Sequence, residues 1–241
     1  MSPLSAVQRT KLRLVMLAEL TRFESALAKN IASILAIQSR QIGRALSKNE
    51  TPGPHTIETG SFLMRSNLKS YYRKVMITFY EQTKKMNAKA SDISVFMEKW
   101  AAQQSQKAVD QIDATTLKRI RTVVDESIQE GLTLDDVIHA LEGTTAAMTL
   151  ARALTIARTE LHLAMNVAQL QAAKDVGNLV KIWTATLDDR TRDAHAEADG
   201  QTVPVDADFE VGGEMIPSPG FGSISNSINC RCVMIFAAQD K

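Results

Sequence analysis

The residue types best suited to chemistry gather between Trp183 and Cys232. His195, Cys230 and Cys232 supply an imidazole and two thiols, the nitrogen and sulfur ligands that Zn²⁺ prefers in proteins. Structural zinc sites usually space their cysteines as C-x₂₋₄-C, whereas these two are spaced C-x-C, and no fourth ligand is obvious. We therefore predict no cofactor and keep zinc on these three residues as an alternative.

Two catalytic interpretations use the same residues. His195-Ala-Glu197 matches the H-x-E half of the zinc deaminase signature, in which the histidine binds metal and the glutamate moves a proton. The other half of that signature, P-C-x-x-C, is here Asn229-Cys-Arg-Cys232, which has one residue fewer between the cysteines. The second interpretation is a nucleophilic Cys230 or Cys232 activated by His195, and it would need an orienting residue that no pattern marks. We predict that the chain is not an enzyme. The alternative is a zinc-dependent hydrolase or deaminase built on His195, Glu197, Cys230 and Cys232.

The same stretch is dense in opposite charges. Its arginines are Arg190, Arg192 and Arg231, and its carboxylates are Asp188, Asp189, Asp193 and Asp199. Bidentate pairs between guanidinium and carboxylate groups can fix a loop-rich fold that has few aromatic residues. We therefore predict a structural clasp, in which loss of Arg192 or Asp188 destabilises the C-terminal part.

The elements that must position these residues are mostly helices. Hydrophobic periodicity, proline and glycine predict helices over 4–47 (one, or two stacked), 61–88, 92–110, 114–131, 133–143 and 145–175. Gly177 closes the last of these. That helix carries Arg158 and His162 on one face, and a buried Arg158 would need a carboxylate, for which Asp188 or Asp189 is the candidate.

The hydrophobic period changes after residue 178. Alternation over 179–187 and short runs at 203–205, 209–211 and 232–237 predict strands. The predicted class is α+β: long helices in a mostly helical N-terminal part, and a small C-terminal antiparallel β-sheet packed on the long helix 145–175.

The net charge of +1 hides an asymmetry. Residues 1–90 hold 15 Lys and Arg against 5 Asp and Glu, whereas the rest of the chain is acidic. We expect the basic part to contact an acidic or polyanionic partner. The candidate contact residues are Arg9, Lys11, Arg13, Arg65, Lys69, Arg73, Lys74, Lys84 and Lys85. The two cysteines form no disulfide framework, and no apolar run could span a membrane, so we expect a cytosolic protein without membrane contact.

Several motifs in a fixed order carry a resemblance to a known family. They are Ala157-Arg-Thr-Glu160, then Trp183, then Asp188-x-Arg-Thr-Arg192, His195 and Asp199-Gly200, then Phe209-x-Val-Gly-Gly213, and finally Pro217 and Asn229-Cys-Arg-Cys232. Over about residues 140–235 the chain resembles the phage Mu F-like minor head protein family. The resemblance implies a structural motif made of Arg158, Glu160, Trp183, Asp188, Arg190, Arg192, His195, Asp199, Gly200, Asn229, Cys230, Arg231 and Cys232.

The resemblance also implies a function. It predicts a phage minor capsid protein, present in several copies, that takes part in procapsid assembly and in packaging and ejection of DNA. Its expected partners are the portal protein, the major capsid or scaffolding protein, and packaged DNA. It would lie inside the capsid near the portal, and in the host cytoplasm during assembly. We predict a basic helical region over 1–113 and the family module over 114–241. Some relatives add a toxin domain, which we do not expect in the nine residues after Cys232.

Overall fold

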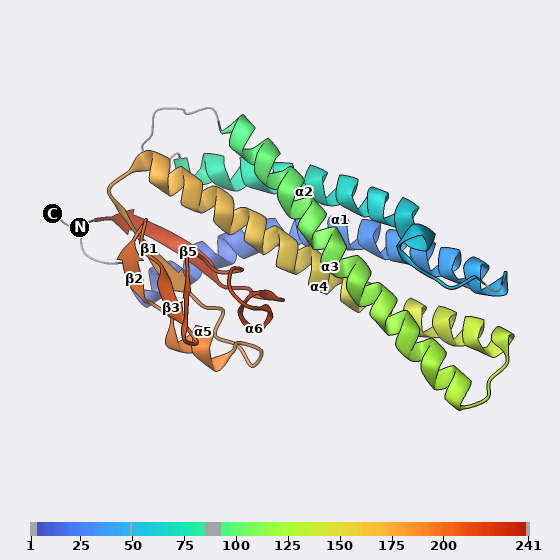
Figure 1. The fold of residues 1–241 in the computed structure, drawn as a ribbon. Helices are drawn as coiled ribbons and strands as arrows, with labels where there is room; N and C mark the ends of the chain where they lie inside the picture. The colour runs from blue at the N-terminus through green and yellow to red at the C-terminus, as the bar shows by residue number, and fades with distance from the viewer. Residues whose placement is uncertain (1–3, 49, 85–92, 240–241) are drawn as a thin grey trace. The chain divides into compact units, whose positions relative to one another are not determined.

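The computed structural model describes residues 4–48, 50–84 and 93–239 (Figure 1). Four long helices come first: α1 (Ala6–Ser47), α2 (Glu58–Lys84), α3 (Ser94–Gln129) and α4 (Leu134–Val176), with a 3-10 turn η1 (Pro54–Ile57) before α2. Short elements follow: β1 (Leu179–Thr184), α5 (Asp193–Glu197), β2 (Thr202–Pro204), β3 (Phe209–Val211), β4 (Glu214–Ile216), α6 (Ile224–Ser227) and β5 (Val233–Ala238). The predicted α+β class is confirmed. No described helix is long and apolar enough to cross a membrane.

Two predicted helix breaks are wrong. α3 continues through residues 110–114, where neither glycine nor proline interrupts it, and α4 continues through Gly143. An interior glycine costs a helix only about 1 kcal/mol relative to alanine, which a helix of 43 residues can absorb. The break predicted at Gly131 does occur, because this residue adopts a φ of 70° in the turn between α3 and α4. The helix end predicted at Ala88 lies outside the described residues.

The chain forms two compact units, to both of which the long helices contribute. Unit 1 comprises Met1–Glu24, Tyr71–Glu98 and Thr155–Lys241, and unit 2 comprises Ser25–Ser70 and Lys99–Leu154. These units are defined by packing within the structure. The predicted division into a helical region over 1–113 and a family module over 114–241 is based on the sequence pattern, and it stays a prediction.

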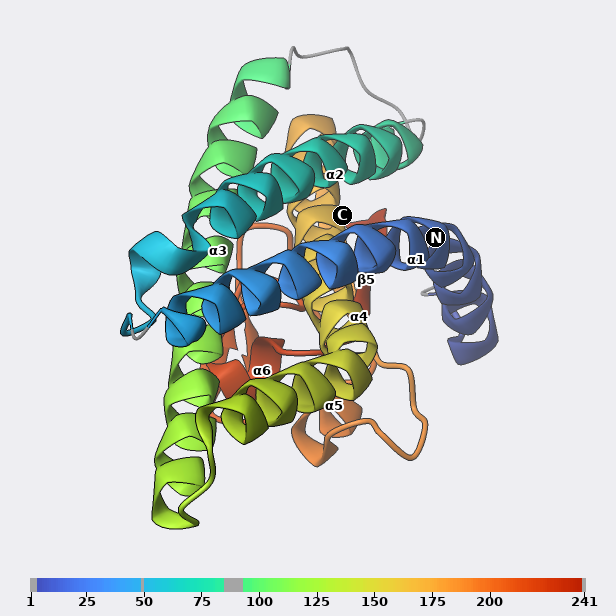
Figure 2. The ribbon, with the colours of Figure 1, turned by 90° about the vertical axis from the view of Figure 1, so that its right-hand side faces the viewer.

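Unit 2 is a purely helical packing of α1, α2, α3 and α4 segments. Figure 2 shows α1 and α2 running side by side, and the Nδ2 of Asn30 donates to the Oδ1 of Asn67 between them at 2.9 Å. The core includes the buried side chains of Ile42, Ile57, Ile120 and Val137. Because each helix buries one apolar stripe, the four segments together enclose what none could bury alone.

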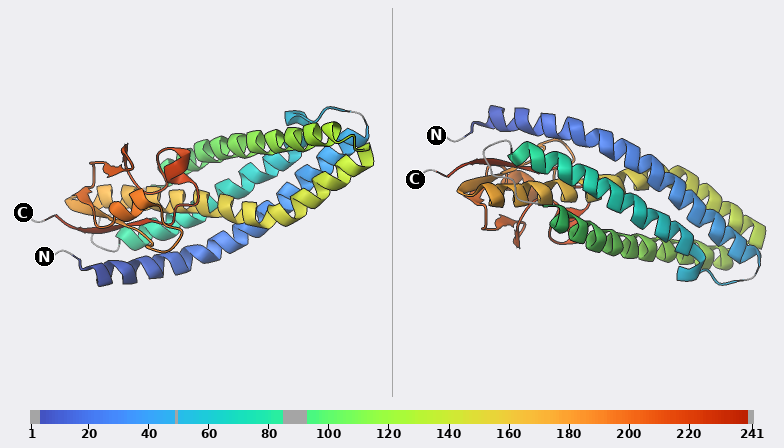
Figure 3. Two further views of the ribbon diagram at one scale, coloured as in Figure 1. Left: turned by 90° about the horizontal axis from the view of Figure 1, so that it is seen from below. Right: turned by 90° about the horizontal axis from the view of Figure 1, so that it is seen from above.

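Unit 1 holds the strands. β1 lies between β2 and β5 in an antiparallel sheet, and β3 pairs with β4 in a second antiparallel sheet. Both views of Figure 3 show this strand-rich segment beside the C-terminal part of α4. Trp183, Phe209 and Phe236 fill the shared core, which Ala173 and Leu170 of α4 join. The strand β4 and the short helices α5 and α6 were not predicted, because elements of three to five residues leave no measurable period.

A buried polar network in unit 2 gives a test of the close approach of α1 and α2. The Nε2 of Gln38 donates to the Oδ1 of Asp113 at 3.0 Å, and the Oγ of Ser61 donates to its Oδ2 at 2.6 Å. Gly60 lies against Gln38, and a Cβ added there would come within 2.3 Å of the Gln38 Cγ.

We predict that Gly60→Ala destabilises unit 2 by about 1–3 kcal/mol, because Gln38 must move and lose its bond to Asp113. The free energy of unfolding in urea measures this. Ser66→Ala, at an exposed position of the same helix, is the matched control and should leave stability unchanged or slightly raised. Equal stability of Gly60→Ala and wild type would contradict the close approach.

Candidate functional site

Residues 155–173 of α4 are all buried or half-buried. From residue 155 to residue 173 no side chain is exposed, yet the segment carries Arg158 and His162. Both contact Glu24 of α1: the Arg158 Nε lies 3.4 Å from its Oε2, and the His162 Nε2 lies 3.0 Å from its Oε1. Arg158 and His162 therefore share a face, as expected, but the predicted carboxylate partner at Asp188 or Asp189 is wrong. Glu24 interrupts the apolar stripe of its helix, which marks it as a buried carboxylate, but no sequence pattern assigns it to Arg158.

Glu160 makes a separate buried bond. The hydroxyl of Tyr72 on α2 donates to the Oε2 of Glu160 at 2.6 Å, and Tyr72 is fully buried. Burial, and then the neighbouring Glu160 charge, raise the pKa of Tyr72 well above its ordinary value. The phenol therefore stays a neutral donor, and Glu160 connects α4 to α2.

Arg158 and Thr159 also hold the loop that precedes the cysteines. The Arg158 Nη1 donates to the Oδ1 of Asn229 at 2.8 Å, and the Asn229 main-chain N–H donates to the Oγ of Thr159 at 2.9 Å. Asn229 adopts a φ of 58°, a left-handed conformation that asparagine tolerates better than most residues. The Ala157–Glu160 motif thus binds the Asn229–Cys232 motif directly.

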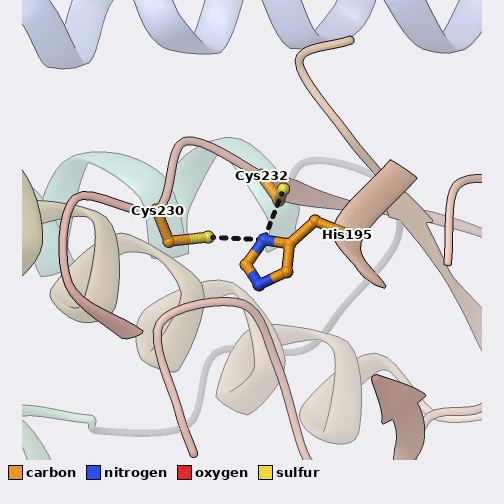
Figure 4. Close-up of side chains that lie close together, drawn as sticks. All are labelled: His195, Cys230 and Cys232. Carbon is orange, nitrogen blue, oxygen red and sulfur yellow. Dashed lines mark hydrogen bonds between the residues drawn. The ribbon is translucent and has the colours of Figure 1, made fainter. Parts of the chain in front are cut away.

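The two thiols and the imidazole are brought together (Figure 4). The Nδ1 of His195 lies 3.4 Å from the Cys232 Sγ and 3.7 Å from the Cys230 Sγ, and all three residues are buried. The Trp183 ring meets the His195 ring edge-on, with centroids 5.4 Å apart. Glu197, two residues further along α5, is exposed and does not join the group, so the proton shuttle of the deaminase interpretation is missing from it.

The two thiols differ in acidity. The hydrogen bond from Cys232, followed by that from His195, lowers the pKa of Cys230 well below its ordinary value despite burial. The same bond to Cys230, together with burial, raises the pKa of Cys232.

The predicted clasp consists of one strong pair. Arg231 donates through Nη1 and Nη2 to the two carboxylate oxygens of Asp188 at 2.5 and 2.6 Å. The hydrogen bond from Arg231, and then the main-chain N–H of Arg190 and the hydroxyl of Thr191, hold the pKa of Asp188 well below its usual range. Arg190 itself is 66% exposed and lies 3.7 Å from Asp188, so it adds a surface pair only.

The remaining members of the predicted clasp have other roles. Arg192 donates to the main-chain carbonyl of Ile228 at 2.6 Å and not to a carboxylate, which corrects its predicted role. Asp199 accepts the main-chain N–H of Ala185 at 2.9 Å and contacts Arg9 at 3.3 Å. Asp189 is almost fully exposed and Asp193 is exposed. Gly200, with a φ of 81°, makes the turn into β2.

The buried Lys181 of β1 holds the loop that follows β4. Its Nζ donates to the Pro217 carbonyl at 2.6 Å and lies 4.9 Å from the centre of the Phe209 ring. Burial lowers the pKa of Lys181 to about 8. No pattern singled out this lysine, because it occupies an ordinary alternating position of β1.

One known protein family matches the segment that contains the site residues from Arg158 to Cys232. Residues 118–235 match the family described as phage Mu protein F like protein. Residues 118–235 form a Mu F-like domain. The resemblance predicted over about residues 140–235 is confirmed, and the family segment begins earlier, within α3.

Three relatives share parts of the chain. Minor head protein GP7 of Bacillus phage SPP1 is 37% identical over 95 residues, which are 37% of this chain and 30% of GP7. NAD(+)--arginine ADP-ribosyltransferase EFV of Enterococcus faecalis is 42% identical over 89 residues, 35% of this chain and 18% of that protein. An uncharacterized protein of Haemophilus influenzae is 38% identical over 90 residues, 35% of this chain and 17% of its own. The chain thus spans less than a third of each relative, and no solved structure matches it.

The predicted partner-binding residues are not equally available. Arg13 is buried and donates to the Thr186 carbonyl at 3.0 Å, Arg9 pairs with Asp199, and Arg73 pairs with Glu98. The ammonium groups of Lys74 and Lys84 lie over the rings of Tyr71 and Tyr80, Arg65 and Lys69 are half-buried, Lys11 is exposed, and Lys85 lies outside the described residues. Arg9 and Arg13 therefore contact the Mu F-like domain and are not free to bind a partner.

Glu24 gives a test of the enclosed helix. Burial would raise the pKa of Glu24, but the hydrogen bond and charge of His162, with Arg158, lower it overall. A lowered carboxylate pKa contributes stability that is present above the ordinary value of 4.5 and is lost as the pH falls through the folded value.

We predict that Glu24→Gln lowers the free energy of unfolding by about 1–3 kcal/mol at pH 7, with the difference from wild type shrinking below pH 4.5. Urea unfolding at several pH values measures it. Glu19→Gln on the same helix, where Gln82 donates to an exposed carboxylate, is the control and should change little. A difference that does not depend on pH would contradict the ionic role of Glu24.

We also predict that Asp188→Ala lowers the melting temperature of the Mu F-like domain, because Arg231 loses both of its carboxylate contacts. Arg190→Ala should stay within about 1 kcal/mol of wild type, since this side chain is mostly exposed. Differential scanning calorimetry compares the two. If both variants melt like wild type, the Asp188–Arg231 pair is not a stabilising clasp.

Proposed function

We propose that this chain is a phage minor head protein that takes part in head assembly by docking on the portal protein. The observation that carries the proposal is the Mu F-like domain over residues 118–235, with the 37% identity to minor head protein GP7. The proposed location is inside the capsid near the portal, in several copies, with host cytoplasm as the site of assembly. Contacts with the major capsid or scaffolding protein, and handling of packaged DNA, belong to the same proposal.

The solvent face of α1 supplies a docking surface with one sign of charge. Within unit 2 the exposed charged residues of this helix are Lys29, Arg40 and Arg44, separated by eleven and four residues. Each separation is close to a whole number of helical turns, so these residues follow one side of the helix. No acidic residue lies in this part of α1. We name these three residues the basic stripe.

We expect the separated cations of the basic stripe to fit an acidic protein surface better than they fit duplex DNA. Duplex DNA would be held without sequence preference and would be released steeply by salt. A folded partner would instead saturate at a fixed ratio, and charge complementarity would mainly raise the association rate. We therefore favour an acidic face of the portal protein over DNA as the first contact.

We predict that reversing the charge of Lys29, Arg40 and Arg44 together, each to Glu, weakens portal binding at least about tenfold. Co-sedimentation of the full chain with portal protein from the same phage, at low and high salt and after nuclease treatment, measures this. The matched control carries Lys107→Glu, Lys118→Glu and Arg121→Glu, an equal charge change at exposed positions of α3.

Each outcome separates the alternatives. Loss of binding in the α1 variant alone supports docking through the basic stripe. Equal loss in both variants would show a general charge effect, and binding abolished by nuclease would assign the surface to DNA. Wild-type binding by both variants would exclude the basic stripe as the docking element.

The similarity to the ADP-ribosyltransferase does not make this chain an enzyme. It covers 18% of that protein, and the family to which residues 118–235 belong supports a structural role. We propose a non-enzymatic assembly protein.

A further inference from the structure

The group formed by His195, Cys230 and Cys232 has a geometry that a plain hydrophobic core does not require. Three groups able to bind a metal, all buried, point their ligand atoms at one spot, and these atoms lie within 4.8 Å of one another (Figure 4). The residues come from α5 and from the loop before β5, so the chain must fold to assemble them. The question is whether their spacing fits a metal ion.

The two nitrogen–sulfur distances match a tetrahedral zinc site. Zinc binds thiolate sulfur at about 2.3 Å and imidazole nitrogen at about 2.0–2.1 Å, which at tetrahedral angles places sulfur and nitrogen about 3.6 Å apart. The two observed distances from the His195 Nδ1 are 3.4 and 3.7 Å. Each thiol therefore lies at a distance from the His195 Nδ1 that suits joint binding of one ion.

The tautomer of His195 is also suitable. Asn226 donates through Nδ2 to the Val211 carbonyl at 3.2 Å, so its Oδ1 faces the His195 Nε2 at 3.3 Å as an acceptor. The proton of the imidazole then resides on Nε2, and Nδ1 presents its lone pair to the sulfurs. An oxygen acceptor on the far nitrogen is the usual support for a metal-binding histidine.

We propose that His195, Cys230 and Cys232 bind one Zn²⁺ ion, with a water molecule as the fourth ligand. Binding deprotonates both thiols and releases the protons to solvent. The ion would join α5 to the loop before β5 and thereby stabilise the strand-rich part of the Mu F-like domain. This inference is independent of the proposed docking on the portal.

The test uses the full chain, purified under reducing conditions, stripped with a chelator and reloaded with Zn²⁺ or Co²⁺. We expect about one metal ion per chain, a higher melting temperature after reloading, and the absorption of a tetrahedral thiolate–Co²⁺ complex. His195→Ala and Cys232→Ser should lose the ion. Asn226→Ala should weaken zinc affinity about 10–100-fold while keeping all three ligands.

His162→Ala is the matched control, because His162 is an equally buried histidine of unit 1 that binds Glu24 and lies outside the group. Retention of zinc in this variant, with loss in His195→Ala, supports the site. The proposal is overturned if the reloaded wild-type chain holds no metal and melts unchanged, or if His195→Ala keeps the ion. The wild-type measurements do not depend on whether any variant folds.

Discussion

Enclosure of the C-terminal part of α4 is the constraint on which unit 1 depends. A helix without any exposed residue from 155 to 173 can carry charged side chains only if each finds a partner inside the protein. Arg158 and His162 find Glu24 of α1, Glu160 finds Tyr72 of α2, and Thr159 finds the main chain of Asn229. One short segment therefore dictates where three other parts of the chain must lie.

This constraint explains why the family pattern couples distant motifs. Ala157–Glu160 and Asn229–Cys232 are separated by about seventy residues, yet the first holds the second through two hydrogen bonds at Asn229. Once Asn229 is fixed, the following residues have little freedom: Cys230 and Cys232 reach His195, and Arg231 reaches Asp188. The buried thiol group and the half-buried clasp are thus two results of one anchored loop.

Sequence reasoning found most of the fold but few of the pairings. The long periodic helices and the alternating β1 gave clear signals, and so did the order of the motifs. The breaks inside α3 and α4 were misplaced because glycine and changes of pattern are weaker stops than capping and packing. β4 was too short to detect.

Pairings over long separations had no local signal. The sequence grouped Asp188 with the arginines nearest to it, whereas the strong partner is Arg231, forty-three residues away. Arg158 was matched to the wrong carboxylates for the same reason, since nothing in a single sequence ranks Glu24 above Asp188. The grouping of His195 with both cysteines rested on residue type alone.

The C-x-C spacing has a consequence for how the chain can vary in length. Two thiols face the interior and the guanidinium between them faces Asp188, so successive side chains point to opposite sides. Insertion or deletion of one residue between Asn229 and Val233 would exchange the two sides, placing a guanidinium against His195 and a thiol against Asp188. A substitution in this loop changes one side chain, whereas a change in its length alters the direction of every side chain between Asn229 and Val233. The length of this loop is therefore fixed. Because α4 holds Asn229 in place, the number of residues after it decides which side chains face the interior.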